Sequence, residues 1–115
     1  MFHRIYLDNS ATTPVDSEVL AEMLPYFTEK FGNASSIHFF GQEARAAVDR
    51  ARHRTAALLN SRPNEIVFTS GGTEANNLAI RGLLQSNDKH GRHLITSAIE
   101  HSAVKMVCED LAKRG

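Results

Sequence analysis

The chain has 115 residues, no net formal charge and 42% hydrophobic residues, which is the composition of a soluble globular domain. Because positive and negative residues balance, we expect no surface of a single charge sign that would suit nucleic acid or an anionic membrane. The chain also has neither a membrane-length apolar run nor a secretory signal pattern. We therefore expect a cytoplasmic location, and the single cysteine, Cys108, excludes an internal disulfide.

The first half of the chain predicts an arm, a short helix, a loop and a long helix. Residues 1–15 join a short apolar piece to a polar segment rich in turn residues. A helix follows from Asp16, a suitable N-cap, and Pro25 is expected to kink or shorten it. Residues 31–38 have no periodicity and predict a loop, whereas apolar positions at helical spacing predict a long helix over residues 40–59.

The second half alternates short β-prone runs with helices. Residues 60–65, which include Pro63, break the long helix. The apolar runs 66–69 and 93–96 predict two buried strands, each followed by a helix, with a polar connection at residues 87–91.

Strands separated by helices indicate an α/β fold with a parallel sheet covered by helices. Two strands are too few for a finished sheet. We therefore expect an N-terminal arm at residues 1–15 and, over residues 16–115, the first part of a larger domain that is incomplete in this chain.

A glycine-rich turn at residues 70–77, Ser-Gly-Gly-Thr-Glu-Ala-Asn-Asn, connects the first predicted strand to its helix. The free amide groups and the positive end of a helix favour a bound phosphate at such a turn. The turn lacks both the dinucleotide and the P-loop patterns, so a small phosphorylated cofactor fits it better. The alternative is a tight connecting turn that Thr73 caps.

Four segments in order resemble the N-terminal portion of a cysteine desulfurase of the iron–sulfur cluster assembly type. That family belongs to the class V aminotransferase-like enzymes of fold-type I, which use pyridoxal 5′-phosphate (PLP). The segments are residues 6–14 (Tyr-Leu-Asp-Asn-Ser-Ala-Thr-Thr-Pro), 32–38 (Gly-Asn-Ala-Ser-Ser-Ile-His), 70–77 and 96–101 (Thr-Ser-Ala-Ile-Glu-His). The resemblance implies the large PLP-binding domain of that fold.

The resemblance also implies roles for individual residues. Gly72 and Thr73 would bind the cofactor phosphate, and His101 would stack on the cofactor ring and act as a catalytic residue in proton transfer. The alternative for His101 is a polar residue at a helix N-terminus. Glu74 would not help to bind phosphate, and we expect it to be a first-turn residue that points to solvent.

The other chemically capable residues have weaker indications. His38 lies in a loop that the family places near the active site, although a single histidine in a loop is more often simply exposed. His90, His93, His101 and Cys108 fit no common zinc spacing, so no metal site is expected. Cys108 occupies an apolar helix position and is expected to be a small buried hydrophobe.

Two departures from the family pattern bear on function. Ala34 stands where relatives usually have proline, and the chain contains neither a Ser-x-His-Lys segment for the cofactor-attaching lysine nor a loop cysteine to receive sulfur. We therefore expect a fragment of a desulfurase that is inactive by itself. The parent would act on L-cysteine as a homodimer and would serve a sulfur acceptor or scaffold protein.

Two alternatives stay open at this point. The chain could belong to a selenocysteine lyase or another class V aminotransferase, which begin similarly. It could instead be a non-catalytic interaction partner of a full-length desulfurase, because unpaired sheet edges and apolar helix faces favour association.

Overall fold

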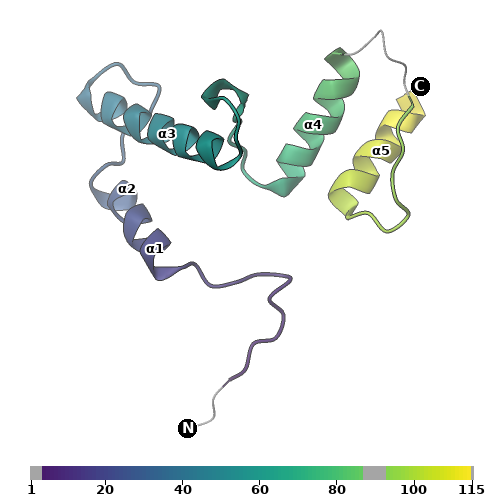
Figure 1. Ribbon diagram of the computed structural model, residues 1–115, viewed down its shortest axis with the longest axis horizontal. Helices are drawn as coiled ribbons and strands as arrows, with labels where there is room; N and C mark the ends of the chain where they lie inside the picture. Colours follow the sequence, from purple (N-terminus) through teal and green to yellow (C-terminus); the bar gives the residue numbers. More distant parts are fainter. Residues whose placement is uncertain (1–3, 87–92, 115) are drawn as a thin grey trace. The chain divides into compact units, whose positions relative to one another are not determined.

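The computed structural model describes residues 4–86 and 93–114 (Figure 1). The chain divides into two compact units, an N-terminal unit of residues 1–66 and a C-terminal unit of residues 67–115. The elements in order are α1 (Ser17–Met23), α2 (Pro25–Thr28), α3 (Phe39–Leu58), the 3-10 helix η1 (Pro63–Glu65), α4 (Gly72–Ser86) and α5 (Ser102–Arg114). Within the described part of the chain, none of the helices has the length and apolar character needed to cross a membrane. The predicted connection at residues 87–91 lies outside the described residues.

The first two helices follow the expected boundaries. The Asp16 carboxylate accepts a hydrogen bond from the Glu18 amide at 2.8 Å and so caps α1. Proline has no amide hydrogen, and its ring clashes with the preceding turn inside a helix. Because of this, α1 ends before Pro25, which opens the separate helix α2, and the expected shortening is confirmed.

The loop at residues 31–38 is held against the first turn of α3 through two glycines. A Cβ on Gly41 would lie 2.2 Å from the Ser36 carbonyl oxygen, and a Cβ on Gly32 would lie 2.1 Å from the Phe40 carbonyl oxygen. A residue without a Cβ is needed for backbones to approach this closely. The predicted loop and the long helix after it are confirmed.

The end of α3 is closed by a left-handed asparagine. Asn60 has a φ of 51°, a conformation that asparagine adopts more readily than most residues. The Ser61 amide donates to the Ala56 carbonyl at 2.9 Å and the Asn60 amide donates to the Ala57 carbonyl at 3.3 Å. These two bonds form a Schellman motif, so the predicted break after the long helix is confirmed.

The C-terminal unit is built from two helices that pack together. Figure 1 shows α4 and α5 side by side and running in the same direction, so both N-terminal ends lie at the same end of the pair. Val107 of α5 is only 4% exposed. An ion pair at 2.8 Å between Arg81 of α4 and Asp110 of α5 links the two helices.

The two predicted strands are the main error of the sequence-based expectation. Residues 66–69 and 93–96 are irregular, and no strand occurs among residues 4–86 and 93–114. Val67 is 65% exposed and Ile95 is 87% exposed, although both were expected in a buried sheet. A strand exists only in a hydrogen-bonded ladder, and a parallel sheet needs several strands with both faces covered. The α/β prediction is therefore met in its helices and not in its sheet.

Candidate active site

The glycine-rich turn leaves the start of α4 open. The Ala75 amide donates to the Gly71 carbonyl at 3.0 Å, which closes the first turn of the helix. The amides of Gly72, Thr73 and Glu74 come before that bond, and helix geometry gives them no acceptor within the helix. A Cβ on Gly71 or Gly72 would meet no atom within 4 Å. No other part of the described chain therefore packs against the Cβ positions of these two glycines.

Glu74 is an exposed residue in the first turn of α4, as expected from sequence, and its side chain also contacts Ser70. Its Oε2 accepts hydrogen bonds from the Ser70 hydroxyl and the Ser70 amide, both at 2.6 Å. The Ser70 hydroxyl, and then the Ser70 amide, hold the pKa of the Glu74 carboxyl below its usual value. Glu74 thus fixes the residue before the glycines and puts a negative charge on that side of the turn.

His101 caps α5. Its Nδ1 accepts a hydrogen bond from the Ala103 amide at 3.1 Å, and its carbonyl accepts from the Val104 amide at 2.9 Å. Since Nδ1 acts as an acceptor, Nε2 carries the hydrogen in the neutral ring. The exposed ring is therefore held by one nitrogen while the other remains a donor.

The structure brings the three site residues predicted from sequence to one end of the C-terminal unit. Gly72 and Thr73 begin α4, and His101 immediately precedes α5. Because the two helices pack in the same direction, these residues lie at the shared N-terminal end of the pair (Figure 1). Two helix ends of positive polarity meet there.

The remaining candidates lie elsewhere. His38 Nδ1 accepts from the Gly41 amide at 3.4 Å, so this histidine caps α3 in the N-terminal unit. Cys108 is half-buried on α5, and His90 lies outside the described residues. Across residues 4–86 and 93–114, no group of three or more His, Cys, Asp or Glu side chains is placed to hold a metal ion.

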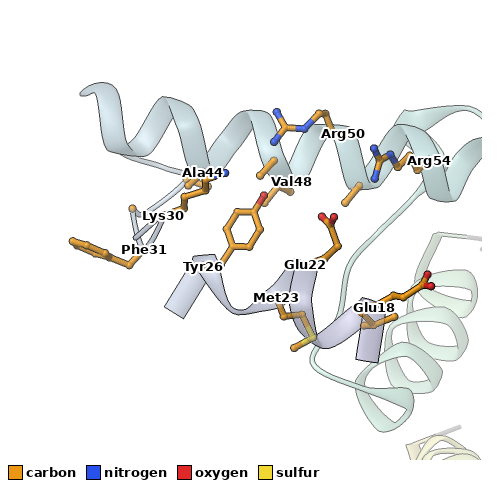
Figure 2. Close-up of a pocket in the computed structure, with 15 residues that line it drawn as sticks. Glu18, Glu22, Met23, Tyr26, Lys30, Phe31, Ala44, Val48, Arg50 and Arg54 are labelled. Atoms are coloured by element: carbon orange, nitrogen blue, oxygen red, sulfur yellow. The ribbon is translucent and has the colours of Figure 1, made fainter. Parts of the chain in front are cut away.

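The N-terminal unit carries a pocket of about 790 Å³ between α1, α2 and α3 that the sequence did not reveal. In Figure 2, the Glu22 side chain extends from α1 toward α3, which contributes Arg50 and Arg54 to the opposite wall. Apolar residues of both walls, such as Val19 and Val48, line the rest. The helical periodicity indicated these apolar faces but gave no sign of a space between them.

The C-terminal unit carries a pocket of about 810 Å³ at the opposite end from the turn. It is lined by the end of α4, by His93, Leu94 and Thr96, and by the last turns of α5. Gly72, Thr73 and His101 line neither pocket. All three residues are exposed in this structure.

The comparison with known families gives the class of protein to which this chain belongs. The aminotransferase class-V family model matches residues 5–115. The chain belongs to the class-V aminotransferase family.

Several similar proteins within this family are named cysteine desulfurases. The chain is 49% identical over 115 residues to the cysteine desulfurase IscS of Dictyoglomus turgidum, covering 100% of this chain and 29% of the relative. It is 53% identical over 111 residues to cysteine desulfurase 2 of Trichormus variabilis, covering 96% of this chain and 28% of the relative. The predicted resemblance to cysteine desulfurases is confirmed.

A solved structure supports the fold family. A NifS-like protein matches 98% of this chain and 31% of its own, with a TM-score of 0.91 and 41% sequence identity. The chain thus spans about 30% of the length of the relatives and the solved structure that it matches.

Proposed function

We propose that residues 16–115 form the first part of the cofactor-binding domain of a PLP-dependent cysteine desulfurase, after an arm at residues 1–15. One observation carries this proposal. The open amide turn of α4 shares an end of the helix pair with His101, in a chain that belongs to the class-V aminotransferase family. The identity of 49% to a cysteine desulfurase supports the choice of reaction.

The residues at the turn fit a phosphate monoester. The amides of Gly72 and Thr73, together with the Thr73 hydroxyl, would hold the phosphate of PLP, and the positive end of α4 favours a dianion there. Open space around Gly71 and Gly72 leaves room for it. Because Glu74 puts a carboxylate beside Ser70, the phosphate would bind on the Gly72 and Thr73 side of the turn.

His101 would contact the ring of the cofactor. When bound, PLP supplies an electron sink for negative charge that develops on the substrate Cα. His101 would stack on the flat cofactor ring and move a proton. Its Nδ1 is engaged by the Ala103 amide, so Nε2 is the atom that would hold the mobile proton.

The proposed reaction converts L-cysteine into L-alanine and passes the sulfur to an enzyme cysteine. The carbon–sulfur bond of the substrate breaks, a carbon–hydrogen bond replaces it, and the enzyme thiol becomes a persulfide. We place the cofactor-attaching lysine and the sulfur-receiving cysteine outside residues 1–115, so this chain alone would be inactive. The working protein would be a cytoplasmic homodimer that delivers sulfur to an acceptor or scaffold protein for iron–sulfur clusters.

An absorbance titration with PLP tests the site in the complete polypeptide that contains this chain. We expect Thr73→Ala and His101→Ala each to weaken binding by about tenfold, because each removes one polar or stacking contact. Thr55→Ala and His53→Ala are matched controls on α3 and should leave the affinity unchanged. Equal affinity in all five proteins would contradict the proposed site.

An activity assay tests the reaction. With a dithiol present to reduce the persulfide, sulfide and alanine should form from L-cysteine, and a clear preference for L-selenocysteine would indicate a selenocysteine lyase instead. Turnover by residues 1–115 alone would contradict the proposed absence of the two reactive residues. Stoichiometric co-purification with a full-length desulfurase, without PLP binding, would favour a non-catalytic partner.

A further inference from the structure

A row of hydrogen bonds runs from the glycine-rich turn along α4 and across to α5. The Asn77 side chain donates from Nδ2 to the Thr73 carbonyl at 2.9 Å, and Arg81 donates from Nε to Asn77 Oδ1 at 3.2 Å. A terminal nitrogen of Arg81 then donates to Asp110 Oδ2 on α5 at 2.8 Å. Residues four apart share a helix face, so Thr73, Asn77 and Arg81 form one line.

The members of this row constrain one another. Asn77 satisfies both neighbours in one orientation only, since a flipped amide would place donor against donor and acceptor against acceptor. The side chains of Arg81 and Asp110 are 31% and 36% exposed. Partial burial reduces the screening that weakens ion pairs at an open surface. Asp110 also accepts from Arg114 Nε at 3.2 Å, so one carboxylate holds two guanidinium groups.

The sequence of α5 allows this pairing in one register. The face that carries Asp110 continues with Met106 one turn earlier and with Arg114 one turn later. Sliding α4 by one turn along α5 would bring Arg81 against an apolar side chain or against a like charge. The Arg81–Asp110 pair therefore selects a single axial alignment of the two helices.

That alignment determines where Thr73 lies relative to His101 along the helix axes. Arg81 follows Thr73 by eight residues, which is about 12 Å along the helix axis. Asp110 follows His101 by nine residues, which is about 13.5 Å. Because α4 and α5 run in the same direction (Figure 1), Thr73 and His101 lie on the same side of the ion pair and at similar distances from it along the helix axes.

We propose that Asn77, Arg81 and Asp110 are positioning residues that set the register of α4 against α5 and so hold the phosphate-binding turn level with His101. This inference rests on the proposed function. A ligand with a ring and a phosphate contacts both His101 and the turn, so its binding depends on how α4 is aligned with α5. A ligand that occupies the turn alone does not depend on that alignment.

The test compares these two kinds of ligand in the complete polypeptide that contains this chain. Deoxypyridoxine 5′-phosphate has the ring and the phosphate but no aldehyde, so it binds without covalent attachment, and inorganic phosphate needs only the turn. In Asp110→Asn and in Arg81→Met, we expect the affinity for deoxypyridoxine 5′-phosphate to fall by about tenfold and that for inorganic phosphate by less than about twofold. Arg81→Lys keeps a cation for Asp110 and should recover most of the loss.

Lys105→Gln is the control, because it removes an exposed ion pair with Glu109 inside α5, at 3.9 Å, and should change neither affinity. Equal weakening of both ligands, or no weakening, in Asp110→Asn would overturn the inference. If that variant does not fold, Asn77→Ala keeps the ion pair between the helices and cuts its link to Thr73. We expect a selective loss of about threefold there, and an unselective result would overturn the inference.

Failure of the proposed function looks different. The unsubstituted protein would then not bind deoxypyridoxine 5′-phosphate at all, which would remove both proposals. Tight binding by the unsubstituted protein together with an unchanged Asp110→Asn variant would contradict the register inference alone.

Discussion

The first turns of α3 and α4 both contain glycine and polar residues, but their surroundings differ. At α3, the preceding loop packs so closely that a Cβ on Gly41 would lie 2.2 Å from the Ser36 carbonyl oxygen. At α4, a Cβ on Gly72 would meet nothing within 4 Å. Glycine thus serves close packing at one helix start and open access at the other.

The two capping histidines extend the comparison. His38 Nδ1 accepts from the Gly41 amide at 3.4 Å, and His101 Nδ1 accepts from the Ala103 amide at 3.1 Å. Both rings therefore have the same local task. The difference lies in the neighbours, because His101 shares its end of the helix pair with the open turn at Gly72 (Figure 1). Capping alone does not mark a functional histidine.

The largest expected effect is the difference in stability between alanine variants of Gly41 and Gly72. Gly41→Ala should lower the free energy of unfolding by about 2 kcal/mol, because the new methyl group must displace the Ser36 backbone. Gly72→Ala has open space and should change it by no more than about 0.5 kcal/mol. Urea denaturation of both variants measures the contrast. A Gly72→Ala variant as destabilised as Gly41→Ala would show that the start of α4 is also packed.

The helices could be predicted from sequence because their signals are local. Asp16 caps α1, Pro25 separates α1 from α2, and Asn60 ends α3, each acting within a few residues of its own position. The runs at 66–69 and 93–96 carry β propensity, but a sheet depends on neighbouring strands that propensity does not supply. The strand prediction therefore was wrong where it depended on distant partners.

The candidate site also combines residues that could be predicted from sequence with a contact that could not. Gly72, Thr73 and His101 could be selected because the glycine-rich turn favours an anion and because four ordered motifs resemble those of a known family, which implies their roles. The Arg81–Asp110 pair joins residues 29 positions apart, and on sequence alone each charge has many equally good partners on a solvated helix face. Its role became visible only once the packing of α4 on α5 was known.

A smaller effect compares the two histidine caps. His38→Ala and His101→Ala should each cost about 0.5 kcal/mol of unfolding free energy, because each removes one side-chain bond to a helix amide. Only His101→Ala should also weaken PLP binding. Denaturation and PLP titration of the same two variants give both quantities. A loss of PLP affinity in His38→Ala would move the candidate site toward the N-terminal unit.

The smallest effect is a pH dependence at the start of α4. The Ser70 hydroxyl and amide lower the pKa of the folded Glu74 carboxyl from its ordinary value of 4.5. A carboxyl with a lowered folded pKa contributes stability above its unfolded pKa, and that stability is lost as the pH falls through the folded pKa. The Ser70–Glu74 contact should therefore persist at neutral pH and be lost below pH 4.5.

The chemical shift of the Ser70 amide follows this contact directly. We expect it to move as Glu74 is protonated, and we expect the movement to disappear in Glu74→Gln, which cannot titrate. The Leu59 amide at the end of α3 should not follow the same curve, because residues 50–64 contain no acidic residue. A Ser70 amide that stays constant through this pH range would mean that Glu74 does not hold the turn in solution, and the two helix starts would then differ only in packing.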